Sequence, residues 1–288
     1  MAQMRIGTCS WKYDSWSGIV YSRPKPANYL AEYADQYDTV EIDQWFWSLF
    51  GPQAVSLPKP QVVDEYSRSV PDGFRFSIKI PNSITLTHYY SNSSKIPLVP
   101  NPHFLSKELF ERFLESIEPL VPRLGPLMFQ FEYLNRQKMP SQGRFQQQLA
   151  AFLDRIDRRH TLGVEIRNPN YLNENFFRFL KDMRLCTVFL QGYYMPSIVE
   201  VYRKFSAHLH DTIVIRLHGP GRSDIEKRSG GRWNKILEPR EAELEDVAAM
   251  INDTIGRKID VYVNVNNHYE GSAPLTIDRL REILEKNR

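Results

Sequence analysis

Cysteine is scarce in this chain of 288 residues, which contains only Cys9 and Cys186. Neither cysteine belongs to a C-x-x-C pair, so the sequence offers no disulfide framework and no thiolate metal site. We expect both residues to be small buried side chains in a protein of a reducing compartment.

Long apolar runs and an excess of one charge are also lacking. No stretch approaches the roughly 18 apolar residues of a membrane span, and MAQMRIGTCSW at the start lacks the apolar centre of a signal peptide. We therefore expect a cytoplasmic protein with no membrane partner. The 37 basic and 34 acidic residues leave a net charge of +3. That charge is too small to indicate nucleic-acid binding by bulk electrostatics, so any anion recognition must be local.

Several short catalytic motifs are missing as well. We find no P-loop, no HExxH zinc motif and no Ser-His-Asp spacing. The segment GTCSWKYDSWSG is not a Gly-rich dinucleotide fingerprint, which disfavours an open doubly wound sheet. No repeat or low-complexity linker divides the chain, so we expect a single domain over residues 1–288.

The sequence instead has short β-rich runs that alternate with longer amphipathic segments, the pattern of βαβ units around a parallel sheet. Eight such runs predict a TIM-like (β/α)₈ barrel of the α/β class. The expected strands are 5–9, 39–43, 74–79, 126–131, 162–167, 185–191, 212–218 and 259–265.

Two connections are too long to be plain loops. Residues 80–105 follow the third expected strand and residues 219–237 follow the seventh. Long segments inside a compact domain are commonly functional, and in a barrel both would lie over the C-terminal mouth, where active sites are built.

Polar side chains stand at the ends of most of these strands, in tetrads such as VEID, VEIR, IRLH and VNVN. Residues two apart on a strand share a face, and the outer face of a barrel strand packs on helices. We therefore expect these side chains to face the barrel axis near its top. They are Glu41, Asp43, Lys79, Gln130, Glu165, Arg167, Arg216, His218, Asn264 and Asn266.

Three interpretations of this polar ring stay open. One is a buried ionic plug without activity, which is disfavoured because full pairing of so many buried groups is demanding. Another is a site for a divalent metal such as Mg²⁺ or Mn²⁺, which prefers oxygen ligands. Its candidate ligands are Glu41, Asp43, Glu165 and His218.

The third interpretation is an anion site. Lys79, Arg167 and Arg216 on the same rim would repel a metal unless a substrate anion intervened, and arginine binds phosphate or carboxylate through two parallel hydrogen bonds. The connection HGPGRS adds two glycines and a group of basic residues after the seventh strand, where barrel enzymes often bind phosphate. The anion interpretation is the better supported one.

Aromatic residues accompany the same rim and are suited to stacking on sugars or bases. Trp11 follows the first strand, and Trp45, Phe46 and Trp47 follow the second. His88, in THYY, is a further candidate acid or base, although a single loop histidine is more often structural.

The ordered motifs resemble one family, the YecE-like proteins, also called domain of unknown function 72. The matching segments are GTCSW (7–11), VEID, FRFSIK with THYY, LGPLMFQF (124–131), VEIRNPNY (164–171), IRLHGP (215–220) and VNVNNHYEGSAP (263–274). They span almost the whole chain in the order of the family. The resemblance implies a TIM-like barrel and an uncharacterised activity.

Carried over by motif, the polar positions of the family fall on Glu41, Lys79, Gln130, Glu165, Arg167, Arg216, His218, Asn266 and Asn267. The chain departs from the family at Asp43, Trp45, Trp47 and Glu132, where the family usually has Asn, Thr, Tyr and Pro. These substitutions add a carboxylate and bulk to the mouth, which leaves open whether this chain shares the substrate of the family.

Our leading hypothesis is an enzyme that binds a small anionic or phosphorylated ligand containing a sugar or a base. Its predicted catalytic residues are Glu41, Glu165 and His218. The predicted binding residues are Lys79, Gln130, Arg167, Arg216, Asn266, Asn267, Trp11 and Trp47. The alternatives are a metal-dependent phosphoester or nucleic-acid hydrolase and a non-catalytic ligand or nucleic-acid binding protein. The sequence leaves the oligomeric state open.

Overall fold

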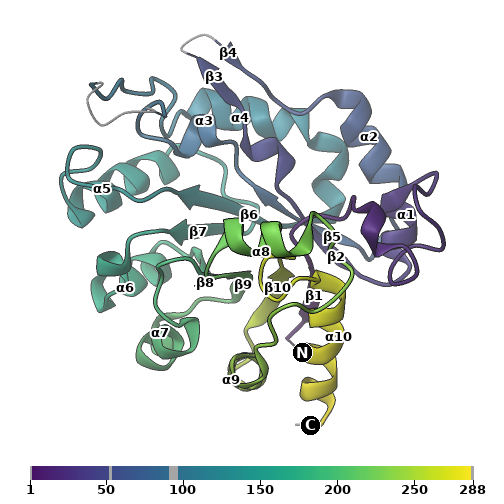
Figure 1. The fold of residues 1–288 in the computed structure, drawn as a ribbon. Coiled ribbons are helices and arrows are strands. Elements are labelled where there is room, and N and C mark those ends of the chain that lie inside the picture. Colours follow the sequence, from purple (N-terminus) through teal and green to yellow (C-terminus); the bar gives the residue numbers. More distant parts are fainter. Residues whose placement is uncertain (1, 52–53, 91–96, 287–288) are drawn as a thin grey trace.

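The computed structural model describes residues 2–51, 54–90 and 97–286. Eight parallel strands close into a barrel in the order β1-β10-β9-β8-β7-β6-β5-β2, with helices around it (Figure 1). The barrel strands are β1 (Met4–Thr8), β2 (Thr39–Ile42), β5 (Arg75–Lys79), β6 (Leu124–Phe131), β7 (Leu162–Ile166), β8 (Cys186–Gly192), β9 (Thr212–Gly219) and β10 (Asp260–Val265). All eight strands expected from the sequence are therefore confirmed, and so is the TIM-like barrel.

Helices follow most strands, and side-chain caps set the start of several of them. Asn28, Ser106, Ser141 and Asn173 each accept a hydrogen bond from a backbone N–H in the first turn of the helix that follows. The helices are α1 (Tyr29–Ala34), α2 (Pro60–Arg68), α3 (Asn82–Thr85), α4 (Lys107–Ser116), α5 (Gln142–Leu153), α6 (Glu174–Asp182), α7 (Ile198–Phe205), α8 (Arg222–Ser229), α9 (Glu241–Gly256) and α10 (Ala273–Lys286). None of these helices is long and apolar enough to cross a membrane.

The long connections contain secondary structure that the sequence patterns did not reveal. The connection after β5 includes α3, and the one after β9 includes α8. A small antiparallel hairpin, β3 (Leu49–Gly51) with β4 (Ala54–Val55), follows β2. Its strands are too short to produce a periodic pattern, which explains why they escape sequence-based prediction.

The inside of the barrel has an apolar layer beneath a polar one. Met128, Cys186, Val188 and Val214 form a small cluster with Tyr262, separate from the main core outside the barrel. Gln130, Arg216 and Asn264 lie two residues further along β6, β9 and β10, so they share the inward face and occupy the next layer. The apolar layer therefore closes the bottom of the barrel under the polar side chains.

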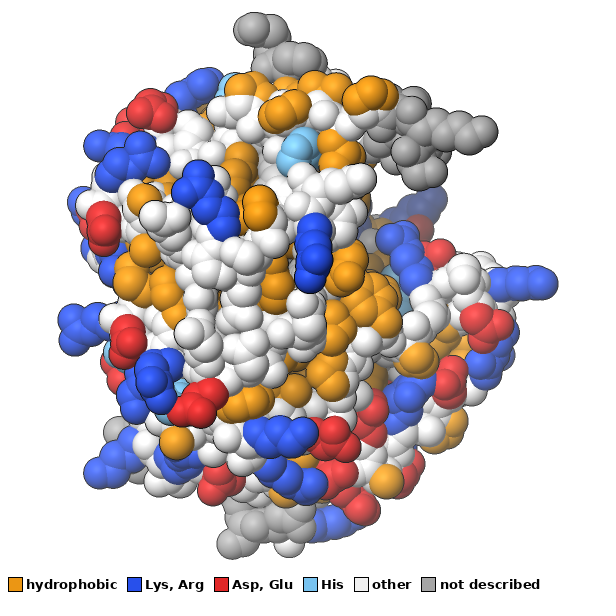
Figure 2. Space-filling view, turned by 90° about the vertical axis from the view of Figure 1, so that its left-hand side faces the viewer, with side chains coloured by type: hydrophobic (Ala, Val, Ile, Leu, Met, Phe, Trp, Pro, Cys, Tyr) orange, Lys and Arg blue, Asp and Glu red, His pale blue; other side chains and the backbone are white. Residues whose placement is uncertain are grey.

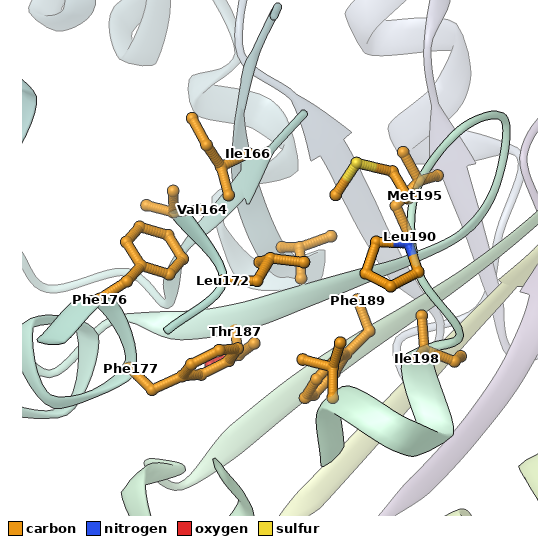
Figure 3. A pocket seen from close by; sticks show the side chains of 13 residues that line it. Val164, Ile166, Leu172, Phe176, Phe177, Thr187, Phe189, Leu190, Met195 and Ile198 are labelled. Carbon is orange, nitrogen blue, oxygen red and sulfur yellow. The ribbon is translucent and has the colours of Figure 1, made fainter. Parts of the chain in front are cut away.

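A small apolar pocket lies on the outer side of β7 and β8, against α6 and α7 (Figure 3). Phe176, Phe177 and Ile198 line it together with the side chain of Thr187. The free space of about 20 Å³ accommodates no more than about one water molecule. This pocket is consequently a packing feature and not a ligand site.

The hydroxyl of Thr187 is buried there without a hydrogen-bond partner among the described residues. Because an unsatisfied buried hydroxyl costs free energy, Thr187→Val is expected to raise the free energy of unfolding by about 1 kcal/mol. Urea denaturation measures this change. Thr276→Val is the matched control, because the buried Thr276 hydroxyl donates to Glu270 at 2.8 Å. Thr276→Val is expected to lower the free energy of unfolding, because it removes this hydrogen bond. A decrease in Thr187→Val as well would contradict the prediction.

Candidate functional site

A buried arginine, Arg216, organises the polar layer of the barrel. Its Nε and Nη2 donate to the two carboxylate oxygens of Glu41 at 2.8 and 2.7 Å. Its Nη1 donates to Glu165 and, at 3.3 Å, to the side-chain oxygen of Gln130. Only 1% of Arg216 is exposed, and Glu41 is fully buried. Arg216 is thus neutralised by protein carboxylates and is not presented to a ligand.

Glu165 is held between two guanidinium groups. Arg216 contacts one of its oxygens, and Arg167 Nε donates to the other at 2.9 Å. Burial alone would raise the pKa of Glu165, but the charges of Arg216 and Arg167 outweigh burial and hold the pKa at about 2. Glu165 therefore remains ionised at neutral pH and is poorly suited to donate a proton.

Asp43 has the opposite electrostatic environment. Burial, and then the negative charge of Glu41, raise its pKa to about 6. Lys79 and Arg216 lower the pKa, but by less. A carboxyl group with this pKa exchanges protons near neutral pH, as general acid–base catalysis requires. Asp43 was a candidate metal ligand from the sequence, and its raised pKa distinguishes it from Glu165.

Lys79 contributes the second type of cation in the mouth. It ends β5, is only 9% exposed, and its Nζ lies 4.0 Å from the centre of the Phe46 ring. Among the described residues, no carboxylate comes within ion-pair distance of this ammonium. Burial, followed by the positive charge of Arg216, lowers the pKa of Lys79 to about 8. Lys79 is consequently a buried cation without an internal counter-ion in contact.

His218 and Cys9 lie next to each other in the mouth. The Nε2 atom of His218 is 3.7 Å from Cys9 Sγ, and its Nδ1 atom is 3.4 Å from the hydroxyl of Tyr193. Burial and the charge of Arg216 lower the pKa of His218 well below its usual range. Burial and Glu41 raise the pKa of Cys9. The pair therefore consists of a neutral imidazole and a neutral thiol, so His218 acts as a hydrogen-bonding group and not as a cation.

Two of the candidate amides support the turn after β10. Asn266 Oδ1 accepts a hydrogen bond from the backbone N–H of His268 at 2.9 Å, and Asn267 Oδ1 accepts from the N–H of Ala273, the first residue of α10, at 2.9 Å. Asn264 instead reaches into the network, where its amide donates to Glu41 at 3.2 Å. The sequence pointed to Asn266 and Asn267 as binding residues, and the structure gives their oxygens local structural partners.

The aromatic candidates occupy different environments. Trp11 is 5% exposed and meets the edge of Tyr66, with 5.0 Å between ring centres. Trp47 is 59% exposed and lies 5.9 Å from the ring of Tyr90. Trp11 is therefore mainly a packing residue, whereas Trp47 presents an open ring face.

The four candidate metal ligands, Glu41, Asp43, Glu165 and His218, are not grouped around one point. In the described part of the chain, no three His, Cys, Asp or Glu side chains are placed to hold one metal ion. Glu41 and Glu165 are both directed at Arg216. The structure thus does not support the divalent-metal interpretation.

The basic connection after β9 contains two internal ion pairs. Arg222 pairs with Glu226, and Arg228 pairs with Asp224. Gly219 is needed for packing, because a Cβ there would lie 2.4 Å from the carbonyl oxygen of His268 and its φ is +75°. These observations account for Gly219 and Arg222 of HGPGRS without an anion. On the face of the molecule that Figure 2 shows, basic and acidic side chains both surround a largely uncharged centre.

Sequence reasoning did not find the close approach of Cys9 and Tyr193 to His218. Cys9 looked like a buried hydrophobic residue, which its 3% exposure confirms. Its position one residue after β1, in GTCSW, was the available signal, because that position is equivalent to the other strand ends. Tyr193 follows β8, and the end of that strand was not among the polar strand ends VEID, VEIR, IRLH and VNVN.

The fold and this network define a TIM-like barrel protein with a buried arginine–glutamate cluster at the carboxyl ends of its strands. The family described as "Protein of unknown function DUF72" matches residues 5–288. The chain belongs to this family, which confirms the resemblance seen in its motifs.

Relatives support the same assignment. The UPF0759 protein YecE of Escherichia coli K12 is 26% identical over 167 residues, which cover 58% of this chain and 49% of that protein. The chain thus spans about half the length of this curated relative. A DUF72 family protein of Thermotoga maritima MSB8 is 22% identical, with a TM-score of 0.66 over 98% of this chain and 99% of that one. One of Enterococcus faecalis V583 is 19% identical, with a TM-score of 0.68 over 98% and 96%. These structures share the fold.

Proposed function

We propose that the barrel mouth binds a small anionic ligand, carrying phosphate or carboxylate, and acts on it by proton transfer. The observation that supports this most directly is Lys79, a buried ammonium with no carboxylate in contact among the described residues. Burying a charge without a partner is costly, and an anionic ligand would remove that cost. The proposal thus explains why a cation is kept in this position.

Arg167 is the second proposed ligand contact. Only its Nε is occupied, by Glu165, and its side chain is 24% exposed. Its guanidinium also lies over the ring of Tyr193, at 5.1 Å. The Nη atoms have no hydrogen-bond partner among the described residues, so they remain able to bind two oxygens of an anion.

The proton-transfer residue in this proposal is Asp43, and His218 contributes a neutral hydrogen bond. In this proposal Glu41 and Glu165 hold Arg216 in place by ion pairs and do not transfer protons. This differs from the catalytic roles expected from the sequence. Trp47 and Tyr90 provide exposed ring faces near the entrance. They would stack on the sugar or base of a larger ligand.

Inorganic phosphate tests the anion part of the proposal. Arg167→Gln is expected to weaken phosphate binding, measured by isothermal titration calorimetry, about tenfold, because it removes one charged hydrogen-bonding partner. Arg178→Gln is the control, since Arg178 lies on α6 and its side chain is 62% exposed. Unchanged phosphate affinity in Arg167→Gln, or an equal loss in both variants, would count against this assignment.

A further inference from the structure

The amine of Lys79 differs from every arginine of the mouth in what surrounds it. Arg216 and Arg167 are hydrogen-bonded to glutamates, whereas the Lys79 ammonium contacts the face of Phe46. Lys79 is also the last residue of β5, at the carboxyl end of a barrel strand, where side chains reach the mouth. This position combines low solvent exposure with a place at the mouth end of the barrel.

Charged groups face Lys79 from three other strands. Glu41 and Asp43 come from the β2 side, Glu165 from β7 and Arg216 from β9. The carboxylates raise the pKa of Lys79, but burial and Arg216 prevail and bring it to about 8. Relative to an ordinary lysine with a pKa of about 10.4, this increases the neutral amine fraction at pH 7 on the order of 100-fold.

We propose that Lys79 is a nucleophile that forms a Schiff base with the carbonyl carbon of a small anionic aldehyde or ketone. This inference rests on the proposed function, because Arg167 supplies the contact that selects an anionic carbonyl compound. A desolvated lysine is the usual amine nucleophile for carbonyl substrates.

Lys79 supplies the electron pair for this step, and Lys79, together with Asp43 or solvent, supplies the protons. The lone pair of neutral Lys79 Nζ attacks the carbonyl carbon, and the π electrons of the C=O bond move to oxygen. One N–H proton of the amine and one proton from Asp43 or solvent convert that oxygen to water. The remaining bond is a protonated C=N bond that keeps the second N–H proton. Asp43 is suited to this transfer because its pKa is about 6.

Reductive trapping of the full chain tests the proposal. The protein is incubated with glyoxylate and sodium cyanoborohydride, and adducts are located by peptide mass mapping. We expect one adduct at Lys79, with a mass gain equal to glyoxylate less one oxygen atom. It should form at least about tenfold faster at pH 7 than adducts on exposed lysines, because more of the amine is neutral. The rate at Lys79 should be half-maximal near pH 8.

Lys79→Met and Lys138→Arg provide the matched variants. Lys79→Met replaces a buried charge by an apolar chain of similar length and is expected to remain folded, which circular dichroism checks. In Lys79→Met the glyoxylate adduct that forms faster than those on exposed lysines should be absent. Lys138→Arg should keep it, because Lys138 is paired with Glu132 at 2.7 Å.

A neutral aldehyde separates the two proposals. For each aldehyde the rate at Lys79 is divided by the rate at the exposed lysines. If this ratio is the same for propionaldehyde and glyoxylate, Lys79 is a nucleophile but the anion contact of the proposed function fails. If neither aldehyde labels Lys79 faster than the exposed lysines, the nucleophile proposal is overturned, even where phosphate still binds through Arg167.

Discussion

Arg216→Met is expected to lower the free energy of unfolding by about 3–5 kcal/mol at pH 7. The reason is that Arg216 pairs with Glu41 and Glu165 inside the barrel. Its removal leaves the buried Glu41 without a counter-ion and leaves Glu165 with Arg167 alone. Methionine fills most of the space of the arginine side chain, so little of this loss comes from a cavity. The loss should therefore exceed that of an apolar core substitution of similar volume. Urea denaturation monitored by circular dichroism measures it.

The pH dependence gives this prediction a distinct signature. The folded pKa of Glu165 is about 2, below its usual value of 4.5. Its interactions therefore stabilise the protein above about pH 4.5, and this contribution is lost as the pH falls towards 2. Arg216→Met lacks the part of this contribution that comes from Arg216. The difference in free energy of unfolding between wild type and Arg216→Met should therefore decrease as the pH falls from 4.5 towards 2.

Two further variants show whether the carboxylates cause the loss. Adding Glu41→Gln and Glu165→Gln to Arg216→Met should recover part of the stability, since the unpaired charges disappear. Arg178→Met is the surface control, because Arg178 and Glu174 are 62% and 61% exposed and such pairs contribute about 0–1 kcal/mol. A similar loss in Arg178→Met and Arg216→Met would refute the prediction.

The alternation of strands and helices was sufficient to predict the barrel, and the polar strand ends predicted where its polar layer lies. Each strand carries its own signal in the sequence, because a buried strand needs an apolar run and parallel strands share one polar end. That Glu41, Lys79, Glu165 and Arg216 lie at the same end of the barrel follows from that pattern alone.

The pairing within the layer did not follow from the sequence. Glu41 and Arg216 are 175 positions apart, and only barrel closure brings them into contact. A sequence lists charges without distances, so Arg216 looked as available to a ligand as Lys79. The same limit applies to Asn267, whose role in holding the start of α10 depends on the turn between two elements.

Asp43→Asn is expected to increase the free energy of unfolding by about 2–3 kcal/mol at pH 8. Burial and Glu41 raise the folded pKa of Asp43 to about 6, from a usual value of 3.8. At a pH between these two values the folded protein binds more protons than the unfolded chain, so wild-type stability falls as the pH rises. Above pH 6 the cost of this partly buried charge is present, and asparagine of nearly the same shape avoids it.

The stabilisation by Asp43→Asn should therefore disappear below about pH 4, where Asp43 is protonated in both states. Asp182→Asn, at the exposed end of α6, is the control and should change stability by less than about 0.5 kcal/mol across this range. Denaturation curves from pH 3 to 8 distinguish the two variants. A stabilisation that does not vary with pH would contradict the electrostatic cause. A pH-dependent gain would mean that the fold retains a destabilising carboxylate at the mouth, which is typical of residues kept for chemistry and not for stability.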